Sequence, residues 1–342
     1  MNSFGRIFRI SIFGESHGES VGIVVDGCPA GMPLTIDDFL PDLERRKGGT
    51  QKGTTPRQEE DLPIFKSGLF NNKTTGAPIT ILFENKNIRS GDYEKQRDVP
   101  RPGHADFVAH KKFAGFEDYR GSGHFSGRLT VALVAAGVIA RKVLNPVGEG
   151  VAEGPKGIEV TSSILEIGGE KDLDKGLQKA IDAKDSIGGI IECRVTGLPV
   201  GLGEPFFDSA ESLLSHIVFA IPAVRGIEFG TGFAAAKMFG SEHNDAIENM
   251  EGKTRTNHAG GIVGGLTNGN ELVFRIAIKP TSSTPKEQIT LNWETGKVEG
   301  ASVKGRHDLC IALRVPVILE AVTAIVLADL MMLEQKIQRI HK

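Results

Sequence analysis

Several residue types that mark whole classes of protein are scarce in this 342-residue sequence. It contains three cysteines, Cys28, Cys193 and Cys310, which are far apart and show neither a CxxC pair nor metal-ligand spacing, so we expect no metal site. So few cysteines fit buried thiols in a reducing cytoplasm. One tryptophan and two tyrosines offer little surface for stacking on bases, and the net charge of −3 argues against a nucleic-acid partner.

The sequence also lacks a targeting signal and a long uncharged apolar run. Residues 1–12 are polar and aromatic rather than typical of a secretory leader. The longest apolar region, Val315 to Leu333, contains Pro316, Glu320 and Asp329. It therefore predicts a core helix and not a membrane span, which needs about 20 nearly uncharged residues. The 43 glycines follow no repeat and gather in loops that also carry polar motifs.

Hydrophobic periodicity predicts a mixture of strands and helices. The predicted strands cover residues 7–13, 22–26, 63–70, 78–84, 158–168, 188–197 and 271–279. The predicted helices cover a segment capped at Thr35 and running through Arg46, then residues 129–144, 173–184, 209–220 and 317–340. The segment 129–144 is apolar nearly all round, so we expect it to be buried. No change in composition marks a linker, so the sequence predicts one domain over residues 1–342, with largely antiparallel pairing and an α+β fold.

Three histidines lie in short segments that are rich in glycine and charge. His17 follows Gly14-Glu-Ser, His104 lies between Arg101 and Asp106, and His307 stands between Arg306 and Asp308. Imidazole titrates near neutral pH, which suits it to proton transfer to a leaving group. For His17 and His104 taken singly, a structural or surface role remains the alternative, and Asp308 taken alone is equally consistent with a local ion pair.

Several polar segments are candidate anion sites. Residues 44–57 hold five basic side chains in a Gly- and Thr-rich setting, which indicates either a loop that folds over a multiply charged substrate or a solvated surface loop. Residues 118–128 precede the buried helix, so Ser126, Arg128 and free backbone N–H groups can bind an anion, unless this is only a capped turn. The segment 279–283, Lys-Pro-Thr-Ser-Ser, suits a phosphate or a flavin edge, or an ordinary polar turn.

Taken in order, these motifs resemble one family over about residues 5–335. They are GESHG at 14–18, RPGHAD at 101–106, DYRGSG at 118–123, VAAG at 134–137, DSIGG at 185–189, GLGEP at 201–205, NHAGG at 257–261, KPTSS at 279–283 and GRHD at 305–308. The family is chorismate synthase of the shikimate pathway. The resemblance implies an FMN-dependent lyase that converts 5-enolpyruvylshikimate 3-phosphate to chorismate by anti-1,4 elimination of phosphate. It also implies helices packed between antiparallel sheets, a homotetramer and a cytoplasmic location.

The resemblance assigns roles residue by residue. It implies that His104 protonates the departing phosphate, that His17 supports the charge of the reduced flavin, and that Asp308 assists proton removal through flavin N5. Implied substrate contacts are Arg46, Lys52, Arg101 and Arg128. Implied flavin contacts are His124, Ser126, Gly264, Lys279, Thr281, Ser282, Ser283 and Arg306.

This sequence departs from the family at a few of these positions. His124 and Phe125 stand where many members have Arg and Ser, and Lys52 replaces an Arg, which keeps the charge but loses the planar fork. Two alternatives therefore stay open. One is a flavin reductase that uses NADPH, with Arg46 and Lys52 as its contacts. The other is an inactive homologue that binds flavin or anions without turnover.

Overall fold

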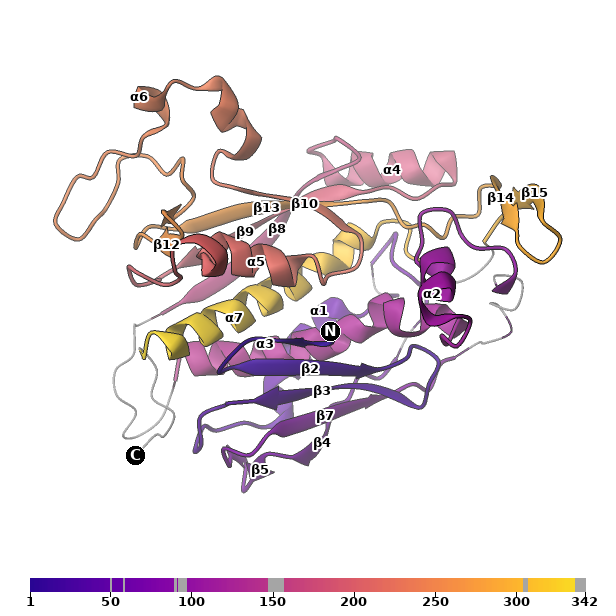
Figure 1. The fold of residues 1–342 in the computed structure, drawn as a ribbon, viewed down its shortest axis with the longest axis horizontal. Helices are drawn as coiled ribbons and strands as arrows, with labels where there is room; N and C mark the ends of the chain where they lie inside the picture. The colour runs from indigo at the N-terminus through magenta and orange to yellow at the C-terminus, as the bar shows by residue number, and fades with distance from the viewer. Residues whose placement is uncertain are drawn as a thin grey trace.

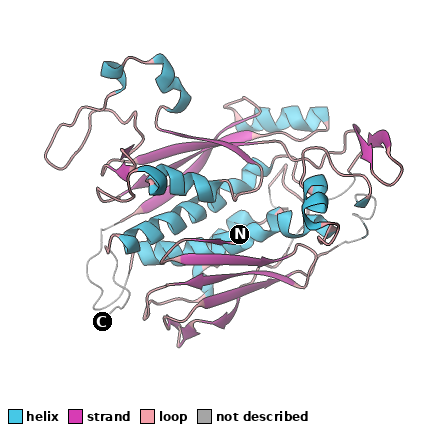
Figure 2. Cartoon of the chain, in the orientation of Figure 1, coloured by secondary structure: helices cyan, strands magenta, loops and turns pink. Residues whose placement is uncertain are grey.

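Two antiparallel sheets enclose a layer of helices (Figure 1). The computed structural model describes residues 1–49, 51–57, 59–88, 91, 97–146, 157–303 and 307–335. Coloured by secondary structure, the same view shows helices between an upper and a lower group of strands (Figure 2). The buried hydrophobic residues of both sheets and of the helices form one connected cluster. This is the α+β sandwich that the sequence predicts.

The lower sheet comes from the N-terminal part of the chain. Its order is β1-β2-β3-β7-β4, and every pairing is antiparallel. The strands are β1 (Ser3–Phe4), β2 (Arg9–Gly14), β3 (Ser20–Asp26), β4 (Ile64–Ser67) and β7 (Ile79–Glu84). Alternate residues such as Ile79, Ile81 and Phe83 are fully buried because every second side chain of a strand points to the same face.

The upper sheet has the order β10-β13-β9-β8 and is also antiparallel. Its strands are β8 (Glu159–Ile167), β9 (Gly189–Thr196), β10 (Val224–Phe229) and β13 (Leu272–Ile278). Helix α4 (Leu173–Ala183) covers the outer side of this sheet (Figure 1). The β10–β13 register shifts between Val224 and Gly226, so Arg225 is the extra residue of a β-bulge.

Two apolar helices form the middle layer. They are α3 (Thr130–Leu144) and α7 (Val315–Leu333), and α1 (Leu40–Arg46) and α5 (Ala210–Val218) pack beside them. By length and composition, residues 311–333 resemble a membrane span, but α7 is buried between the sheets, as expected for a core helix. Gly137 of α3 lies against Ala321 of α7: a Cβ added at Gly137 would come within 2.3 Å of the Ala321 Cβ. The absence of a side chain at Gly137 therefore lets the two helices approach closely.

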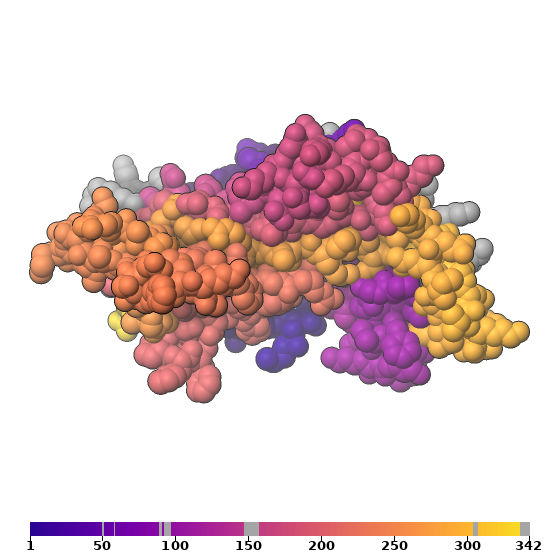
Figure 3. Space-filling view, turned by 90° about the horizontal axis from the view of Figure 1, so that it is seen from above, coloured from indigo at the N-terminus to yellow at the C-terminus, as the bar shows by residue number. Residues whose placement is uncertain are grey.

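A hairpin and a short helix flank one end of the sandwich. Helix α2 (Asp106–Phe113) lies against the hairpin of β14 (Gln288–Asn292) and β15 (Lys297–Ala301), as Figure 3 also shows. Trp293, at the hairpin turn, stacks on His110 of α2 with ring centroids 4.7 Å apart. The remaining short elements are β5 (Leu69–Phe70), β6 (Lys73–Thr74), α6 (Gly240–His243), β11 (Ile262–Val263) and β12 (Leu266–Thr267).

The structure corrects five sequence-based expectations. Strand β10 lies in a segment that the sequence analysis left without a strand, and α2 was likewise missed. The helix capped at Thr35 is two pieces, a 3-10 turn over Ile36–Asp38 and then α1. The final helix ends at Leu333 and not at residue 340; residues 336–340 lie outside the described chain. The segment 63–70 contains two short strands because the chain turns at Gly68, where φ is +84°.

The close approach of α3 and α7 gives a first prediction. Replacing Gly137 with Ala forces the two helices apart, and we expect this overpacking to cost about 1–3 kcal/mol. Thermal unfolding followed by circular dichroism measures the change. Gly240→Ala is the matched control because its added Cβ meets nothing within 4 Å. An unchanged Tm for Gly137→Ala would contradict the packing described here.

Candidate active site

One large cavity opens where loops from both sheets meet the N-terminal ends of α3 and α7. Its volume is about 890 Å³, within the range of about 300–1,000 Å³ that is usual for small-molecule and cofactor sites. The candidate residues that line it are Arg46, Arg101, His104, His124, Ser126, Arg128, Lys279, Thr281, Ser282, Ser283 and Asp308. Segments more than 250 residues apart in sequence thus contribute to one site.

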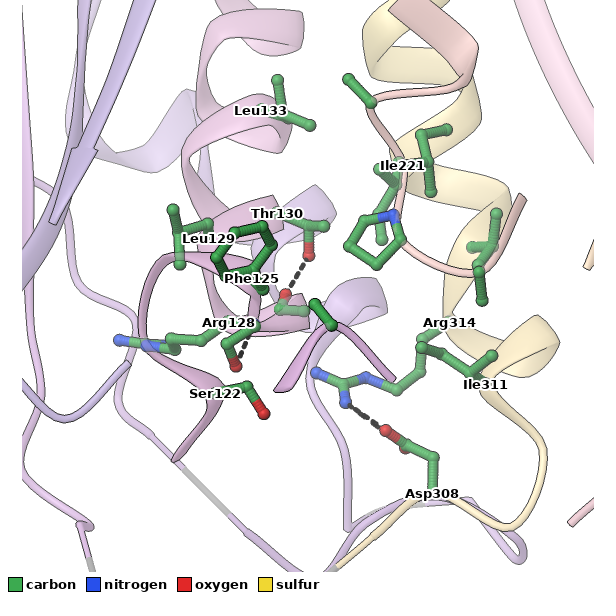
Figure 4. Close-up of a pocket in the computed structure, with 18 of the residues that line it drawn as sticks. Ser122, Phe125, Arg128, Leu129, Thr130, Leu133, Ile221, Asp308, Ile311 and Arg314 are labelled. Carbon is green, nitrogen blue, oxygen red and sulfur yellow. Dashed lines mark hydrogen bonds and ion pairs between the residues drawn. The ribbon is translucent and has the colours of Figure 1, made fainter. Parts of the chain in front are cut away.

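One part of the wall is apolar. Leu129 and Leu133, at the start of α3, face Ile221 and Ile311 across the cavity (Figure 4). Phe125 lies next to Leu129 in the same view. Apolar walls with a few polar groups at defined points are typical of sites for flat organic ligands.

A buried carboxylate joins two of the candidate arginines. Asp61 is almost fully buried; one oxygen accepts from Arg46 Nη1 at 3.1 Å, and the other accepts from Arg128 Nη1. Arg46 also donates to the Thr130 hydroxyl, and Arg128 donates to the Asn85 side chain. Burial lowers the pKa of the Arg46 guanidinium, and the charge of Asp61 opposes that shift. Asp61 therefore holds guanidinium groups from α1 and from the start of α3 at one point of the wall.

A second cluster fixes His104. Arg101 donates Nε and Nη2 to the two oxygens of Asp106, each at 2.7 Å, and Nη1 to Ser283 at 3.0 Å. His104 Nδ1 lies 2.6 Å from Asp106 Oδ1. Although burial alone would raise the pKa of Asp106, hydrogen bonds from Arg101 and His104 hold it well below its usual range. Asp106 is therefore an anion that orients the imidazole, which leaves Nε2 as the ring nitrogen available to a ligand.

Asp308 is held from two sides. Arg314 Nη1 lies 3.0 Å from Asp308 Oδ2 (Figure 4), and the backbone N–H of Thr55 donates to Oδ1 at 2.8 Å. Arg314 in turn donates Nε to the backbone oxygen of Arg46. Asp308 thereby ties the basic loop before residue 57 to the start of α7.

The Lys279–Ser283 segment closes another side of the cavity. Lys279 Nζ donates to the Gly103 carbonyl at 2.8 Å and lies 2.6 Å from the Ser282 hydroxyl. The Thr281 hydroxyl is buried and finds no hydrogen-bond partner within the described part of the chain. A buried hydroxyl of this kind points to a group that is supplied by a ligand.

Three further candidates lie at or behind the wall. His17 is buried against Gly121, where an added Cβ would come 2.2 Å from the imidazole Cδ2, so the ring is covered by a residue that lines the cavity. His124 lines the cavity, and its Nδ1 lies 2.9 Å from the Gly14 carbonyl. The hydroxyl of Ser126 accepts from the Arg128 backbone N–H and caps the short 3-10 turn Gly127–Leu129 that leads into α3, not α3 itself.

Besides His17, three candidates are not placed in the cavity. Lys52 donates to Gln178 of α4, and Gly264 lies in the β11–β12 turn; neither lines the cavity. Arg306 falls outside the described residues. Sequence reasoning also missed Asp61, Glu59 and Arg314, which line the cavity. The sequence gives no signal for Asp61, because its partners Arg46 and Arg128 are distant in the chain.

Comparison with known proteins agrees with this geometry. The family model described as chorismate synthase matches residues 8–332. The chain belongs to the chorismate synthase family. A chorismate synthase from Chitinophaga pinensis is 68% identical over all 342 residues, and each chain is covered completely. One from Methanocaldococcus jannaschii is 42% identical and covers 97% of this chain and 96% of its own.

A solved structure, titled as the crystal structure of chorismate synthase, shows the same fold. Its TM-score is 0.71 at 23% identity, and the match covers 97% of this chain and 93% of that one. Membership of the chorismate synthase family makes this chain a phosphate-eliminating lyase of the shikimate pathway. The α+β architecture predicted from the sequence is thereby confirmed.

The Asp61 bridge gives a second prediction. Asp61→Asn removes the charge that compensates two buried guanidinium groups, and breaking a buried pair of this kind costs about 3–5 kcal/mol. We expect a lower Tm and a lower midpoint of urea unfolding. Asp26→Asn is the control, because Asp26 pairs with Arg9 on the surface and such pairs contribute about 0–1 kcal/mol. Equal effects of the two substitutions would show that Asp61 does not hold the two arginines.

Proposed function

We propose that the large cavity binds 5-enolpyruvylshikimate 3-phosphate together with reduced FMN and carries out the anti-1,4 elimination that yields chorismate. The observation that carries this proposal is the convergence of His104, Asp308 and three candidate arginines on one cavity. The substrate bears a phosphate and two carboxylates, so a wall rich in guanidinium groups suits it.

The residues of the cavity fit a flavin. Leu129, Leu133, Ile221 and Ile311 offer apolar walls for a flat ring, and Thr281 presents a buried hydroxyl that has no hydrogen-bond partner among the described residues. The residues proposed to hold FMN are His124, Ser126, Lys279, Thr281, Ser282 and Ser283. When bound in reduced form, the flavin supplies electron density that favours departure of the phosphate. Gly264 and Arg306 stay predictions as flavin contacts, and Lys52 stays one as a substrate contact.

His104 acts in this proposal as the general acid. Its Nδ1–H donates to Asp106, so a protonated ring presents Nε2–H to the leaving phosphate. Asp106 remains ionised and stabilises the imidazolium that this step needs. Arg101 keeps Asp106 in place through a bidentate pair.

The other candidate residues have separate roles in this proposal. Arg46, Arg101 and Arg128 give the wall its positive charge and attract the anionic substrate. Asp308, fixed by Arg314 and Thr55, is the carboxylate that assists removal of the substrate proton. His17, behind Gly121, supports negative charge in the cavity from the second layer.

Flavin reduction by NADPH remains a prediction. The two proposed NADPH contacts lie in different places: Arg46 is buried in the cavity wall, whereas Lys52 hydrogen-bonds Gln178 outside the cavity. Anaerobic NADPH consumption, compared with product formation from dithionite-reduced FMN, separates a self-reducing enzyme from one that depends on an external reductant.

A homotetramer and a cytoplasmic location complete the proposal. Several large apolar side chains are strongly exposed, and their burial between copies of the chain would explain this exposure. They are Phe206, Phe207, Phe233, Phe239 and Met250. The three cysteines are free and buried, and burial raises the pKa of each thiol, which suits a reducing compartment.

Replacing the general acid tests the mechanism. His104→Ala should slow phosphate release by about 10²-fold or more, the usual scale for general acid catalysis, while the fold stays intact. An oxygen-free assay with 5-enolpyruvylshikimate 3-phosphate and dithionite-reduced FMN measures the rate. His243→Ala, in α6 and away from the cavity, is the control. Wild-type turnover in His104→Ala would remove His104 from the mechanism.

A pair of substitutions tests Asp308. Asp308→Ala should bind FMN nearly normally and lose most of its activity. Asp308→Asn still accepts the bond from the Thr55 backbone, so it separates the loss of charge from any shift of the loop. We expect both variants to be slow in the same assay. Full activity in Asp308→Asn would show that the carboxylate charge is not needed.

A further inference from the structure

Five of the six arginines that line the described cavity are paired with a carboxylate of the protein. Five lining arginines each have a carboxylate within ion-pair distance. They are Arg46 and Arg128 with Asp61, Arg57 with Glu59, Arg101 with Asp106, and Arg314 with Asp308. A carboxylate partner reduces the attraction of an arginine for a ligand anion, although Arg46 and Arg128 share one carboxylate and keep a positive charge between them.

Arg225 differs from these five. It lines the cavity and is exposed, and its side chain forms no hydrogen bond or ion pair with any residue that the structure describes. Lys279 also lines the cavity, and its ammonium group contacts only neutral oxygens, those of Gly103 and Ser282. The cavity therefore has two cations with no carboxylate partner in the described chain.

The backbone brings these two cations together. Arg225 is the extra residue of the bulge where β10 pairs with β13, and Lys279 directly follows β13 (Figure 1). The Lys279 backbone N–H donates to the Ala223 carbonyl at 2.9 Å, which locks the two segments side by side. Bulges are frequent next to active sites because they re-aim a side chain. Because of this bulge, Arg225 does not follow the alternating side-chain directions of β10, and it lines the cavity.

We propose that Arg225, together with Lys279, binds the phosphate monoester of a cavity ligand. A phosphate monoester carries a charge of about −1.5 to −2 at neutral pH, so it balances two neighbouring cations where a single carboxylate would leave one unpaired. Repulsion from Arg225 adds to burial in lowering the pKa of Lys279, which a bound dianion would reverse. The inference rests on the proposed function, in which FMN and the substrate each carry such a phosphate.

Flavin binding with and without the phosphate tests the inference. We would titrate FMN and riboflavin into the wild type, Arg225→Ala and Arg225→Lys, and follow flavin fluorescence. If the flavin phosphate is the ligand group, Arg225→Ala weakens FMN binding by about 10-fold or more, leaves riboflavin binding unchanged, and is partly rescued by Arg225→Lys. Arg9→Ala, which removes an exposed arginine outside the cavity, should change neither affinity.

Kinetics with the substrate test whether the substrate phosphate, rather than the flavin phosphate, is the group that is bound. If the substrate phosphate is the group bound, Arg225→Ala leaves both flavin affinities unchanged and raises KM for 5-enolpyruvylshikimate 3-phosphate by about 10-fold, with little change in kcat. Unchanged affinities for FMN, together with unchanged KM, would overturn the inference. Absence of FMN binding to the wild type would instead count against the proposed function, so the two failures are distinguishable.

Discussion

Two guanidinium groups that share one buried carboxylate form the centre of this site. Arg46 comes from α1 and Arg128 from the turn before α3, and both would be strongly destabilising if they were buried without Asp61. The bridge therefore fixes the position of the N-terminal end of α3 relative to α1. Leu129 and Thr130 follow Arg128 directly, so the apolar wall of the cavity depends on the same contact.

The same principle is repeated around the cavity. Asp106 binds both Arg101 and His104, and Asp308 binds Arg314. Each carboxylate restricts the rotamers of a long basic side chain before any ligand arrives, so less entropy is lost on binding. Pairing also lowers the net charge of the wall, so a strongly charged ligand needs cations that are not already paired.

The long apolar helices and the strands of both sheets follow from periodicity, because burial on α3 and α7 leaves a continuous hydrophobic pattern in the sequence. Periodicity did not predict strand β10, because Gly226 and the bulge at Arg225 interrupt its alternation of side-chain directions. Resemblance to a family predicted most of the candidate residues that the cavity brings together. The resemblance did not identify Asp61, which lies in an ordinary acidic stretch of the sequence. The role of Asp61 is visible only in the structure, where Arg46 and Arg128 both contact it.

The chain has one tryptophan, and its position has a practical consequence. Trp293 stacks on His110 in α2, the helix whose first residue, Asp106, orients His104. Indole emission is sensitive to a stacked imidazole and to solvent, so the intrinsic fluorescence of the protein reports on the seating of α2 against the hairpin. Its intrinsic fluorescence can therefore report, without an attached dye, on the position of the helix that carries the Asp106 partner of His104.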